Sequence, residues 1–344
     1  MNLGPANVYK PRGAERLHMA YRSVAVLAGF LITAVSVAAP ANARVTPTLD
    51  ASLKEWMSHY QVPAASVAIM QNDRLVSTFG LGGMNAGSPA RIASLSKAIT
   101  GVCIAHLVDA GRLSFTTPLG TVLATTFARL GQPADPRFRT ITIEQLLRHR
   151  AGLPREAMTG APPRDLTGSF ITILATPLAH DPGGPMVYSN IGYLTLGMVV
   201  EAVTGSDYER YCREVALRPM RAAGTIDPRL RPRASSGGWL VSAIDYARFI
   251  QVFEPGPAGL GPLARQWQDA LNGQRAYGLG VGILRNEQGI ILSHSGRVAL
   301  RERGGSYVVR FPNGWTAVTI FAGDPLSGVT ADFRRRLEAT LAGL

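Results

Sequence analysis

Strand-forming segments lie at both ends of this 344-residue chain, and helix-forming segments fill the part between them. Near the N-terminal end, β-rich runs at 64–70 and 74–79 flank the turn Asn72-Asp73, a pattern typical of a hairpin. Further strands are predicted at 278–284, 290–294, 306–311 and 315–321. A single sheet completed by both ends of the chain accounts for this order. The sequence therefore predicts an α+β fold, in which helices flank an antiparallel sheet and a mainly helical part is inserted.

The helical segments follow from apolar periodicity and from end signals. They are predicted at 49–61, 91–111, 191–203, 208–217, 243–253 and from about Val329 onward. Thr142 and Gln145 form a T-x-x-Q capping box that opens a short helix, and Gly205 closes the helix at 191–203. The sheet part then covers about residues 44–93 and 275–344, and the helical part about residues 94–274.

The helix at 91–111 opens with the sequence R-I-A-S-L-S-K. Three residues of α-helix turn the chain by about 300°, so Ser94 and Lys97 share one face and Ser96 points away from them. A serine attacks a carbonyl only when a base accepts its proton, and an amine is such a base only when its pKa falls well below about 10.4. Burial at a helix start lowers this pKa, because loss of water and the helix dipole both disfavour the ammonium. Ser94 and Lys97 are therefore candidate catalytic residues.

The choice of basic residues supports this interpretation. The chain has 35 Lys and Arg residues, and its only lysines are Lys10, Lys54 and Lys97. Because arginine cannot release its proton, a lysine kept three residues after a serine indicates chemistry rather than surface charge. The alternative is a capping serine followed by a solvated lysine, which the S-x-x-K pattern also matches.

The N-terminal part has the pattern of a secretory signal peptide. An apolar run at 24–39 follows Arg22 and precedes the A-x-A pattern at 41–43. Since the run is shorter than the ~20 residues of a membrane span, we expect residues 1–43 to be a cleaved signal, with Met19 as an alternative start. The mature chain, 44–344, is then periplasmic or secreted and has no membrane span. The alternative is an N-terminal membrane anchor.

Charge and cysteine usage limit the classes of partner and cofactor that we expect this chain to bind. The formal net charge is +12, but the arginines are spread singly, so we expect no nucleic-acid binding. The one cluster, at 334–336, falls on the polar face of the predicted C-terminal helix. No His/Cys cluster has metal spacing, so we expect no metal and no organic cofactor. The two cysteines, Cys103 and Cys212, lie in predicted helices; export permits a disulfide without requiring one, and Cys103 is predicted to be core.

Three further motifs follow Ser94 and Lys97 along the chain. Tyr188-Ser189-Asn190 places a phenol and an amide at the start of a predicted helix. His294-Ser295-Gly296 ends a predicted strand, where small residues let a substrate approach the backbone, and His149 to Pro154 (H-R-A-G-L-P) marks a tight connection. Taken singly, Tyr188 is also explained as a core tyrosine, Asn190 as a helix cap and His149 as a structural residue.

In this order and spacing, the motifs resemble those of the serine β-lactamase and penicillin-binding-protein superfamily, most closely its class C-like branch of D-aminopeptidases, DD-peptidases and esterases. The resemblance runs from about residue 63 to 321 and implies a β-lactamase/DD-peptidase-like fold. It implies that Ser94 is the acylated nucleophile. Lys97 would accept the serine proton or hold Tyr188 as a phenolate, and Tyr188 would shuttle the proton to the leaving group and later activate water.

The resemblance also implies the substrate-binding residues. Asn190 would hydrogen-bond a substrate amide or position Lys97, and the backbone N–H groups of Ser94 and Arg297 would form the oxyanion hole. His294, with Ser295 and Gly296, stands where penicillin-binding enzymes usually carry the lysine of K-T-G. This departure weakens the case for β-lactams or D-Ala-D-Ala, because His is mostly neutral at pH 7. The arginines that follow, at 297, 301 and 303, either replace the missing charge or form a solvated loop.

These features predict an exported serine hydrolase that acts on a small-molecule or peptide ester or amide, in an oligomeric state that the sequence leaves open. One alternative is a true β-lactamase or DD-carboxypeptidase. A second is a penicillin-binding or sensing module that is acylated without turnover. A third is a basic-patch binder of nucleic acid or of an anionic envelope polymer.

Overall fold

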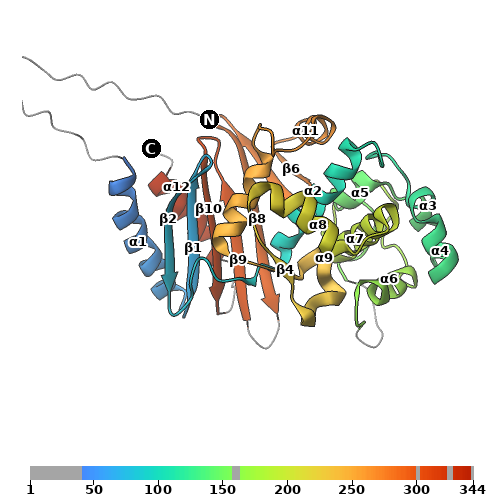
Figure 1. The fold of residues 1–344 in the computed structure, drawn as a ribbon, viewed down its shortest axis with the longest axis horizontal. Helices are drawn as coiled ribbons and strands as arrows, with labels where there is room; N and C mark the ends of the chain where they lie inside the picture. Colours follow the sequence, from blue (N-terminus) through green and yellow to red (C-terminus); the bar gives the residue numbers. More distant parts are fainter. Residues whose placement is uncertain (1–40, 157–162, 300–302, 324–327, 342–344) are drawn as a thin grey trace, which may run out of the picture. The chain divides into compact units, whose positions relative to one another are not determined.

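The sheet is assembled from both ends of the chain, which confirms the predicted α+β class (Figure 1). The computed structural model describes residues 41–156, 163–299, 303–323 and 328–341. Seven antiparallel strands follow the order β2-β1-β10-β9-β8-β7-β6. Their bounds are β1 (Ala65–Gln71), β2 (Arg74–Leu81), β6 (Arg275–Gly278), β7 (Val281–Asn286), β8 (Gly289–Ala299), β9 (Arg303–Arg310) and β10 (Trp315–Ala322).

Helices cover both faces of the sheet, so its central strands are buried on both sides. The helices α1 (Ala41–His59) and α12 (Val329–Leu341) lie on one face (Figure 1), where the Trp56 indole donates a hydrogen bond to the Val329 carbonyl at 2.9 Å. Alternate residues of β1 serve the two cores, since Val67 packs with α1 and α12 while Ala68 packs with the helical part. This is the expected consequence of the two-residue period of a strand.

The helical part packs on the other face around α2 (Ser96–Asp109), which is buried on nearly every side. The other α-helices are α3 (Leu119–Val122), α4 (Ala124–Leu130), α5 (Ile143–Leu147), α6 (Leu166–Leu174), α7 (Asn190–Thr204), α8 (Tyr208–Cys212), α9 (Ala234–Gly237), α10 (Ala243–Phe249) and α11 (Pro262–Asp269). The short helical turns are η1 (Ala93–Leu95), η2 (Pro136–Thr140), η3 (Arg213–Leu217), η4 (Arg218–Met220), η5 (Pro228–Arg233) and η6 (Ile250–Phe253). A small sheet has the order β3 (Ala90–Arg91), β5 (Trp239–Val241), β4 (Thr225–Ile226).

Several predicted ends agree with the structure. The capping box at Thr142 and Gln145 opens α5, and Gly205 ends α7 in the left-handed conformation. Ser189, rather than Asn190, caps α7 by accepting a hydrogen bond from the Gly192 N–H. The predicted helix at 208–217 is instead one α-helical turn, α8, followed by a π-helical turn.

The prediction of one strand at 278–284 is wrong, because a tight turn divides this segment between β6 and β7. The turn residues Leu279 and Gly280 both have positive φ, 46° and 82°, as a two-residue hairpin turn requires. No Asn-Gly or Asp-Gly pair announces this turn in the sequence. A buried leucine in the left-handed region is uncommon, so the strand pattern of the apolar residues concealed the break.

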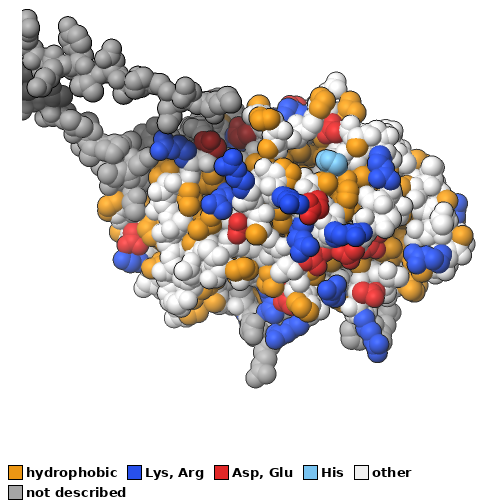
Figure 2. Space-filling view, in the orientation of Figure 1, with side chains coloured by type: hydrophobic (Ala, Val, Ile, Leu, Met, Phe, Trp, Pro, Cys, Tyr) orange, Lys and Arg blue, Asp and Glu red, His pale blue; other side chains and the backbone are white. Residues whose placement is uncertain are grey.

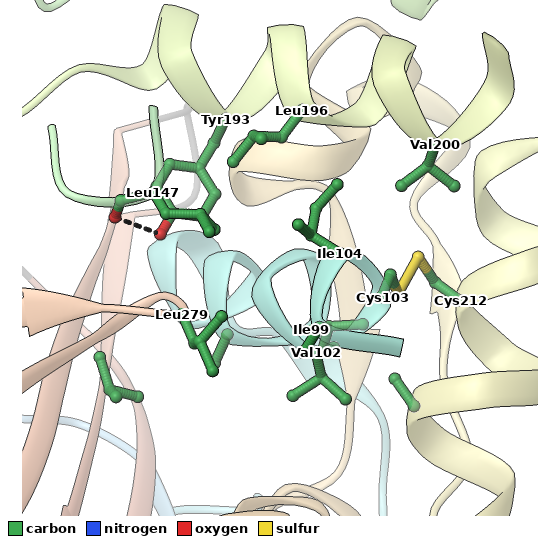
Figure 3. Packing of buried hydrophobic residues seen from close by; sticks show 14 of the residues in the cluster. Ile99, Val102, Cys103, Ile104, Leu147, Tyr193, Leu196, Val200, Cys212 and Leu279 are labelled. Carbon is green, nitrogen blue, oxygen red and sulfur yellow. Dashed lines mark hydrogen bonds between the residues drawn. A yellow bond between two sulfur atoms is a disulfide. The ribbon is translucent and has the colours of Figure 1, made fainter. Parts of the chain in front are cut away.

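This β6–β7 turn packs directly on the backbone of α2 (Figure 3). A Cβ atom on Gly280 would lie 2.2 Å from the carbonyl carbon of Lys97, and one on Gly101 would lie 2.3 Å from the carbonyl oxygen of Leu279. Only glycine permits these approaches. The turn therefore places the sheet against the first turns of α2 and excludes water from Lys97.

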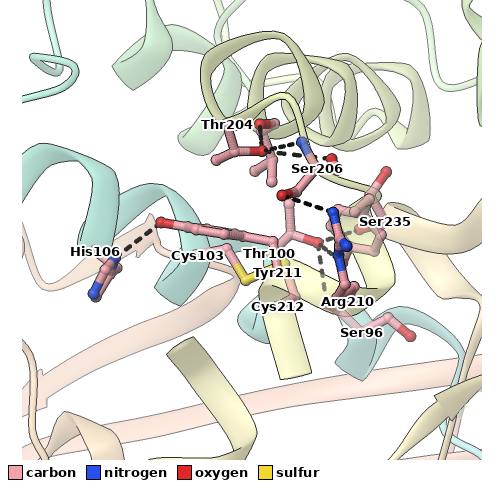
Figure 4. Close-up of a disulfide and its surroundings, with 12 residues drawn as sticks. Ser96, Thr100, Cys103, His106, Thr204, Ser206, Arg210, Tyr211, Cys212 and Ser235 are labelled. Atoms are coloured by element: carbon pink, nitrogen blue, oxygen red, sulfur yellow. Dashed lines mark hydrogen bonds between the residues drawn. A yellow bond between two sulfur atoms is a disulfide. The ribbon is translucent and has the colours of Figure 1, made fainter. Parts of the chain in front are cut away.

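A disulfide joins Cys103 of α2 to Cys212 of α8 (Figure 4). The prediction that Cys103 belongs to the core is confirmed, since both cysteines are fully buried. Next to the disulfide, the Thr100 hydroxyl donates to the Ser235 carbonyl at 2.6 Å and lies 2.7 Å from the Tyr208 hydroxyl. These contacts tie α2 to the segments that surround the start of the helix.

The predicted signal segment lies outside the described residues, apart from residues 41–43, which belong to α1. Its cleavage and the alternative start at Met19 therefore stay predictions. In the part of the chain that the structure describes, no helix combines the length and the apolar character needed to cross a membrane.

We predict that Gly280→Ala lowers the free energy of unfolding more than Gly205→Ala does. Both glycines have positive φ, which costs an L-residue about 1–2 kcal/mol. A Cβ at Gly205 would meet no atom within 4 Å, whereas one at Gly280 would overlap the backbone of α2, a clash worth about 1–3 kcal/mol more. Urea unfolding of the two variants measures the difference. Equal losses would contradict the packing described here.

Candidate active site

Ser94 lies in the turn η1, two residues before α2 begins at Ser96, and not inside an α-helix as the sequence predicts. The preceding residue, Ala93, has φ of 46°, a strained conformation for a residue with a Cβ. Strand β8 packs closely against this turn. A Cβ on Gly296 would lie only 2.6 Å from the Ile92 carbonyl oxygen. Ser94 is half-buried, so its hydroxyl is reachable from solvent.

Lys97 brings its amine to the Ser94 hydroxyl, at 3.2 Å between Nζ and Oγ. The same nitrogen donates to Asn190 Oδ1 at 2.6 Å and to the Ser236 carbonyl at 2.7 Å. Both of these oxygens are acceptors only. A neutral amine has two N–H groups, which these two oxygens satisfy, and one lone pair, which is left for the Ser94 O–H. The contacts therefore fit an uncharged lysine that can take the serine proton.

Burial lowers the pKa of Lys97 well below its usual value, because the ammonium would lose its water in this fully buried position. The Glu156 carboxylate opposes the shift, and the guanidinium groups of Arg155 and Arg233 add to it. The Lys97 pKa falls because the β6–β7 turn and α9 pack around the side chain and exclude water. Lys97 is thus an amine that burial prepares as a base.

Tyr188 also lies beside the Lys97 amine. Its ring centroid is 5.0 Å from Lys97 Nζ and 5.2 Å from Arg155 Cζ, and the ring packs on that of His149 at 4.4 Å. Burial raises the pKa of Tyr188 to about 12, and a hydrogen bond with the Ser94 hydroxyl opposes the rise. The phenol is therefore neutral at pH 7, so the structure favours Lys97 over a Tyr188 phenolate as the base.

Asn190 connects Lys97 to a residue that the sequence analysis missed, Glu156. Its amide nitrogen donates to Glu156 Oε1 at 2.5 Å, which fixes the amide oxygen toward Lys97. Glu156 comes here because the Ser189 hydroxyl donates to the Pro154 carbonyl at 2.6 Å and the Asn190 N–H to the Arg155 carbonyl at 2.8 Å. No motif spacing links these segments, so only the fold shows the contact.

His294 is buried, and its ring centroid lies 6.1 Å from that of Tyr188. Its Nε2 lies 3.0 Å from the Tyr277 hydroxyl. Burial lowers the pKa of His294 to about 3, and the nearby Lys97 adds to the shift. The neutral state expected from the sequence is thus reinforced by the site, and His294 brings no positive charge to a substrate.

Ser295, Gly296 and Arg297 continue strand β8, which corrects the prediction that His294-Ser295-Gly296 ends a strand. The partner strand β7 pairs with β8 only as far as Ser293, whereas β9 pairs with it along the whole motif. Beyond Ser293, the edge of β8 turned away from β9 therefore has no partner among the described strands. This edge lies against η1, where backbone groups can meet a substrate.

Two cavities meet at Ser94, and Arg155 and Arg297 line both. The first, the Asn190 cavity, has a volume of about 370 Å³ and is also lined by Asn190, Glu156, Ser236, Gly237, Leu230, Ala93, Val298, Arg91 and Arg233. The second, the Tyr188 cavity, has a volume of about 530 Å³ and is also lined by Tyr188, Tyr277, His294, Ser295 and Gly296. The nucleophile can therefore be reached by the two halves of a substrate, one in each cavity.

Two neighbouring residues have structural roles. Ser96 points away from the pair, as predicted, and its hydroxyl accepts from the Trp239 N–H at 3.2 Å. His149 Nδ1 accepts from the Ser189 N–H at 3.1 Å, which agrees with its interpretation as a structural residue.

In the described residues, no group of three or more His, Cys, Asp or Glu side chains could hold a metal ion.

Known proteins share this sequence pattern and this architecture. A family model described as Beta-lactamase matches residues 49–342. The protein flp of Staphylococcus aureus (strain MW2) is 27% identical over 190 residues, which are 52% of this chain and 37% of that protein. The chain therefore spans little more than a third of that relative's length.

Solved structures show the same fold at low identity. The beta-lactamase/D-alanine carboxypeptidase of Yersinia pestis has a TM-score of 0.73 and 17% identity, over 88% of this chain and all of that one, 100%. A class C beta-lactamase has a TM-score of 0.72 and 14% identity, over 87% of this chain and 97% of that one. At these identities the likeness concerns the fold.

The charges around Lys97 predict pH effects of opposite sign. Glu156→Gln removes a carboxylate that raises the Lys97 pKa, so the pKa falls and Ser94 stays reactive to lower pH. Arg155→Gln removes a charge that lowers this pKa, so the acid limb moves to higher pH. The measurement is the acylation rate of Ser94 by 4-nitrophenyl acetate across pH. Shifts of the same sign would contradict the assignment of the limb to Lys97.

Proposed function

This chain belongs to the beta-lactamase family, and we propose that it is an exported serine hydrolase that cleaves an ester or amide through an acyl-enzyme on Ser94. One observation carries the proposal. The buried Lys97 Nζ donates to Asn190 and Ser236 and lies 3.2 Å from the Ser94 hydroxyl, and burial lowers its pKa well below the usual value. This is the pairing of a nucleophile with a base that acyl transfer needs.

Acylation begins when Lys97 accepts the Ser94 proton and Oγ attacks the substrate carbonyl carbon. The carbonyl oxygen becomes an oxyanion, which the N–H groups of Ser94 and Arg297 stabilise. One such donor contributes about 2.7–4 kcal/mol in comparable hydrolases. The carbon–leaving group bond then breaks, and the leaving group takes the proton of the Tyr188 hydroxyl while Lys97 returns its proton to Tyr188.

Deacylation repeats these steps with water. A water molecule enters from the Tyr188 cavity and attacks the ester carbonyl of acylated Ser94, giving its proton to the Lys97 and Tyr188 pair. The Ser94–acyl bond breaks, and the serine oxygen recovers the proton. The cavity of about 530 Å³ beside Tyr188, His294 and Ser295 supports this route, since it reaches Ser94 from solvent.

The enzyme alternative is a true β-lactamase or DD-carboxypeptidase. His294, whose pKa is lowered to about 3, is neutral and occupies the position of the usual lysine. It therefore provides no cation for the carboxylate of a β-lactam or a D-Ala-D-Ala peptide, which favours another substrate. A penicillin-binding module without turnover is the second alternative. Acylation needs the contacts among Ser94, Lys97 and Asn190 in either case, and the cavity beside Tyr188, which gives water a route to the acylated serine, supports turnover.

The basic-patch alternative finds little support in the surface. On the face drawn in Figure 2, Lys and Arg side chains are interspersed with Asp and Glu. The arginines at 334–336 form ion pairs with Glu338, Asp332 and Glu55. A nucleic-acid surface needs a field of one sign.

Export is supported by the disulfide between Cys103 and Cys212, because such bonds persist mainly in oxidising compartments. The apolar run at 24–39 supplies the matching signal. Sequencing the N-terminus of the periplasmic or secreted protein tests the cleavage expected after residue 43.

The direct test of the acyl-enzyme is intact-mass analysis after exposure to 4-nitrophenyl esters and β-lactams, with peptide mapping of the adduct. We expect a transient acyl adduct on Ser94 from the esters. Ser94→Ala should abolish it, and Ser96→Ala, the matched control two residues away, should keep it. An adduct on another residue, or none with any compound, would overturn the proposal.

Tyr188→Phe should remove the proton donor for the leaving group. We expect kcat/KM for an ethyl ester to fall about 10²–10⁴-fold, because this leaving group needs a proton. The loss should be much smaller for the 4-nitrophenyl ester of the same acid, whose leaving group departs as an anion. Steady-state hydrolysis of the two esters measures this. Equal losses would count against Tyr188 as the proton donor.

A further inference from the structure

The two cavities at Ser94 have different chemistry, which assigns them to different halves of the substrate. This assignment rests on the proposed function. Because the proton for the leaving group comes from Tyr188, the leaving group occupies the Tyr188 cavity. The acyl half then lies in the Asn190 cavity, whose Ser236 and Asn190 already hold Lys97.

The Asn190 cavity is strongly cationic. Four guanidinium groups line it, those of Arg91, Arg155, Arg233 and Arg297, whereas Glu156 is the one carboxylate among the described residues that line it. Arg91 is paired with the buried Asp227 outside the cavity, at 2.7 Å. The rest of this space of about 370 Å³ presents Arg155 and Arg233 beside the carboxylate of Glu156.

Arg155 and Arg233 are the residues best placed to meet a ligand. The Arg155 guanidinium lies over the Tyr188 ring, and no described carboxylate is within ion-pair distance of it. Arg233 lies 3.3 Å from Glu156, and both side chains are about half exposed, 53% and 46%. An exposed pair of this kind contributes about 0–1 kcal/mol, so Arg233 can turn to a better partner at little cost.

The inner walls of the cavity are small and apolar. Ala93 and Gly237 flank Ser94, and the side chains of Leu230 and Val298 close the sides. An acyl chain can therefore run from Ser94 along apolar surface toward the guanidinium groups. Guanidinium groups bind carboxylate and phosphate in bidentate geometry.

We propose that the Asn190 cavity binds an acyl group that ends in an anionic substituent, and that Arg155 and Arg233 determine this specificity. A half-acid ester, or the amide of a dicarboxylic acid, has this chemistry. The neutral His294 in the Tyr188 cavity is consistent with the division, since Arg155 and Arg297 line both cavities whereas Arg91 and Arg233 line the Asn190 cavity alone.

The test uses three 4-nitrophenyl esters with the same leaving group and acyl chains of matched length. The first is the mono-ester of adipic acid, the second its neutral carboxamide counterpart, and the third the cationic ester of 6-aminohexanoic acid. We expect kcat/KM to fall in this order, with the anionic ester at least about 10-fold above the neutral one. The preference should shrink as salt is added.

Variants of the cavity test whether Arg155 and Arg233 cause the preference for the anionic ester. Arg155→Gln and Arg233→Gln should each reduce the ratio of anionic to neutral kcat/KM about 10-fold. Use of the ratio cancels their effect on Lys97, which is common to both esters. Arg155→Lys should restore part of the preference. Arg218→Gln, which removes an exposed arginine that lines neither cavity, should leave the ratio unchanged.

The outcomes separate this inference from the proposed function. If wild-type protein hydrolyses all three esters through Ser94 with similar kcat/KM, the charge preference is wrong and the hydrolase stands. A preference that survives both Arg155→Gln and Arg233→Gln would also overturn the assignment of the cavity. If no ester forms an adduct on Ser94, the proposed function itself fails.

Discussion

The site depends on a buried lysine whose charged form is disfavoured because burial removes its water. The β6–β7 turn packs on the first turns of α2 through Gly280 and Gly101, and water cannot reach Lys97. Asn190 and Ser236 accept two hydrogen bonds from its nitrogen, and the third direction points to Ser94. Fold, electrostatics and chemistry meet in this contact, because the sheet that excludes water also supplies β8, the edge of the site.

Much of this could be predicted from local sequence. The strands at both ends, the capping box at Thr142 and the pairing of Ser94 with Lys97 follow from periodicity and short spacing. Prediction from local sequence failed where tertiary contacts override the intrinsic preference of a segment for strand or helix. Leu279 adopts a left-handed turn inside an apolar run, and Ser94 lies in a 3₁₀ turn that β8 holds in place.

The residues missed by sequence analysis are those that reach the site only through folding. Glu156 and Arg155 come to Asn190 because Ser189 and the start of α7 bind the 154–155 backbone, and Ser236 contributes only a carbonyl oxygen. The cysteine pair is likewise brought together by the packing of α8 on α2, 109 residues apart in sequence. No spacing rule connects such segments, so their roles needed coordinates.

The central claim is that Lys97 is an uncharged amine at neutral pH. The chain has only three lysines, so NMR of protein labelled with ¹³C-lysine gives few ε-carbon signals, and Lys97→Met assigns the one that matters. The account predicts that this signal has the chemical shift of a neutral amine at pH 7 and titrates well below the usual value of about 10.4. A Lys97 signal that remains that of an ammonium up to pH 10 would contradict it.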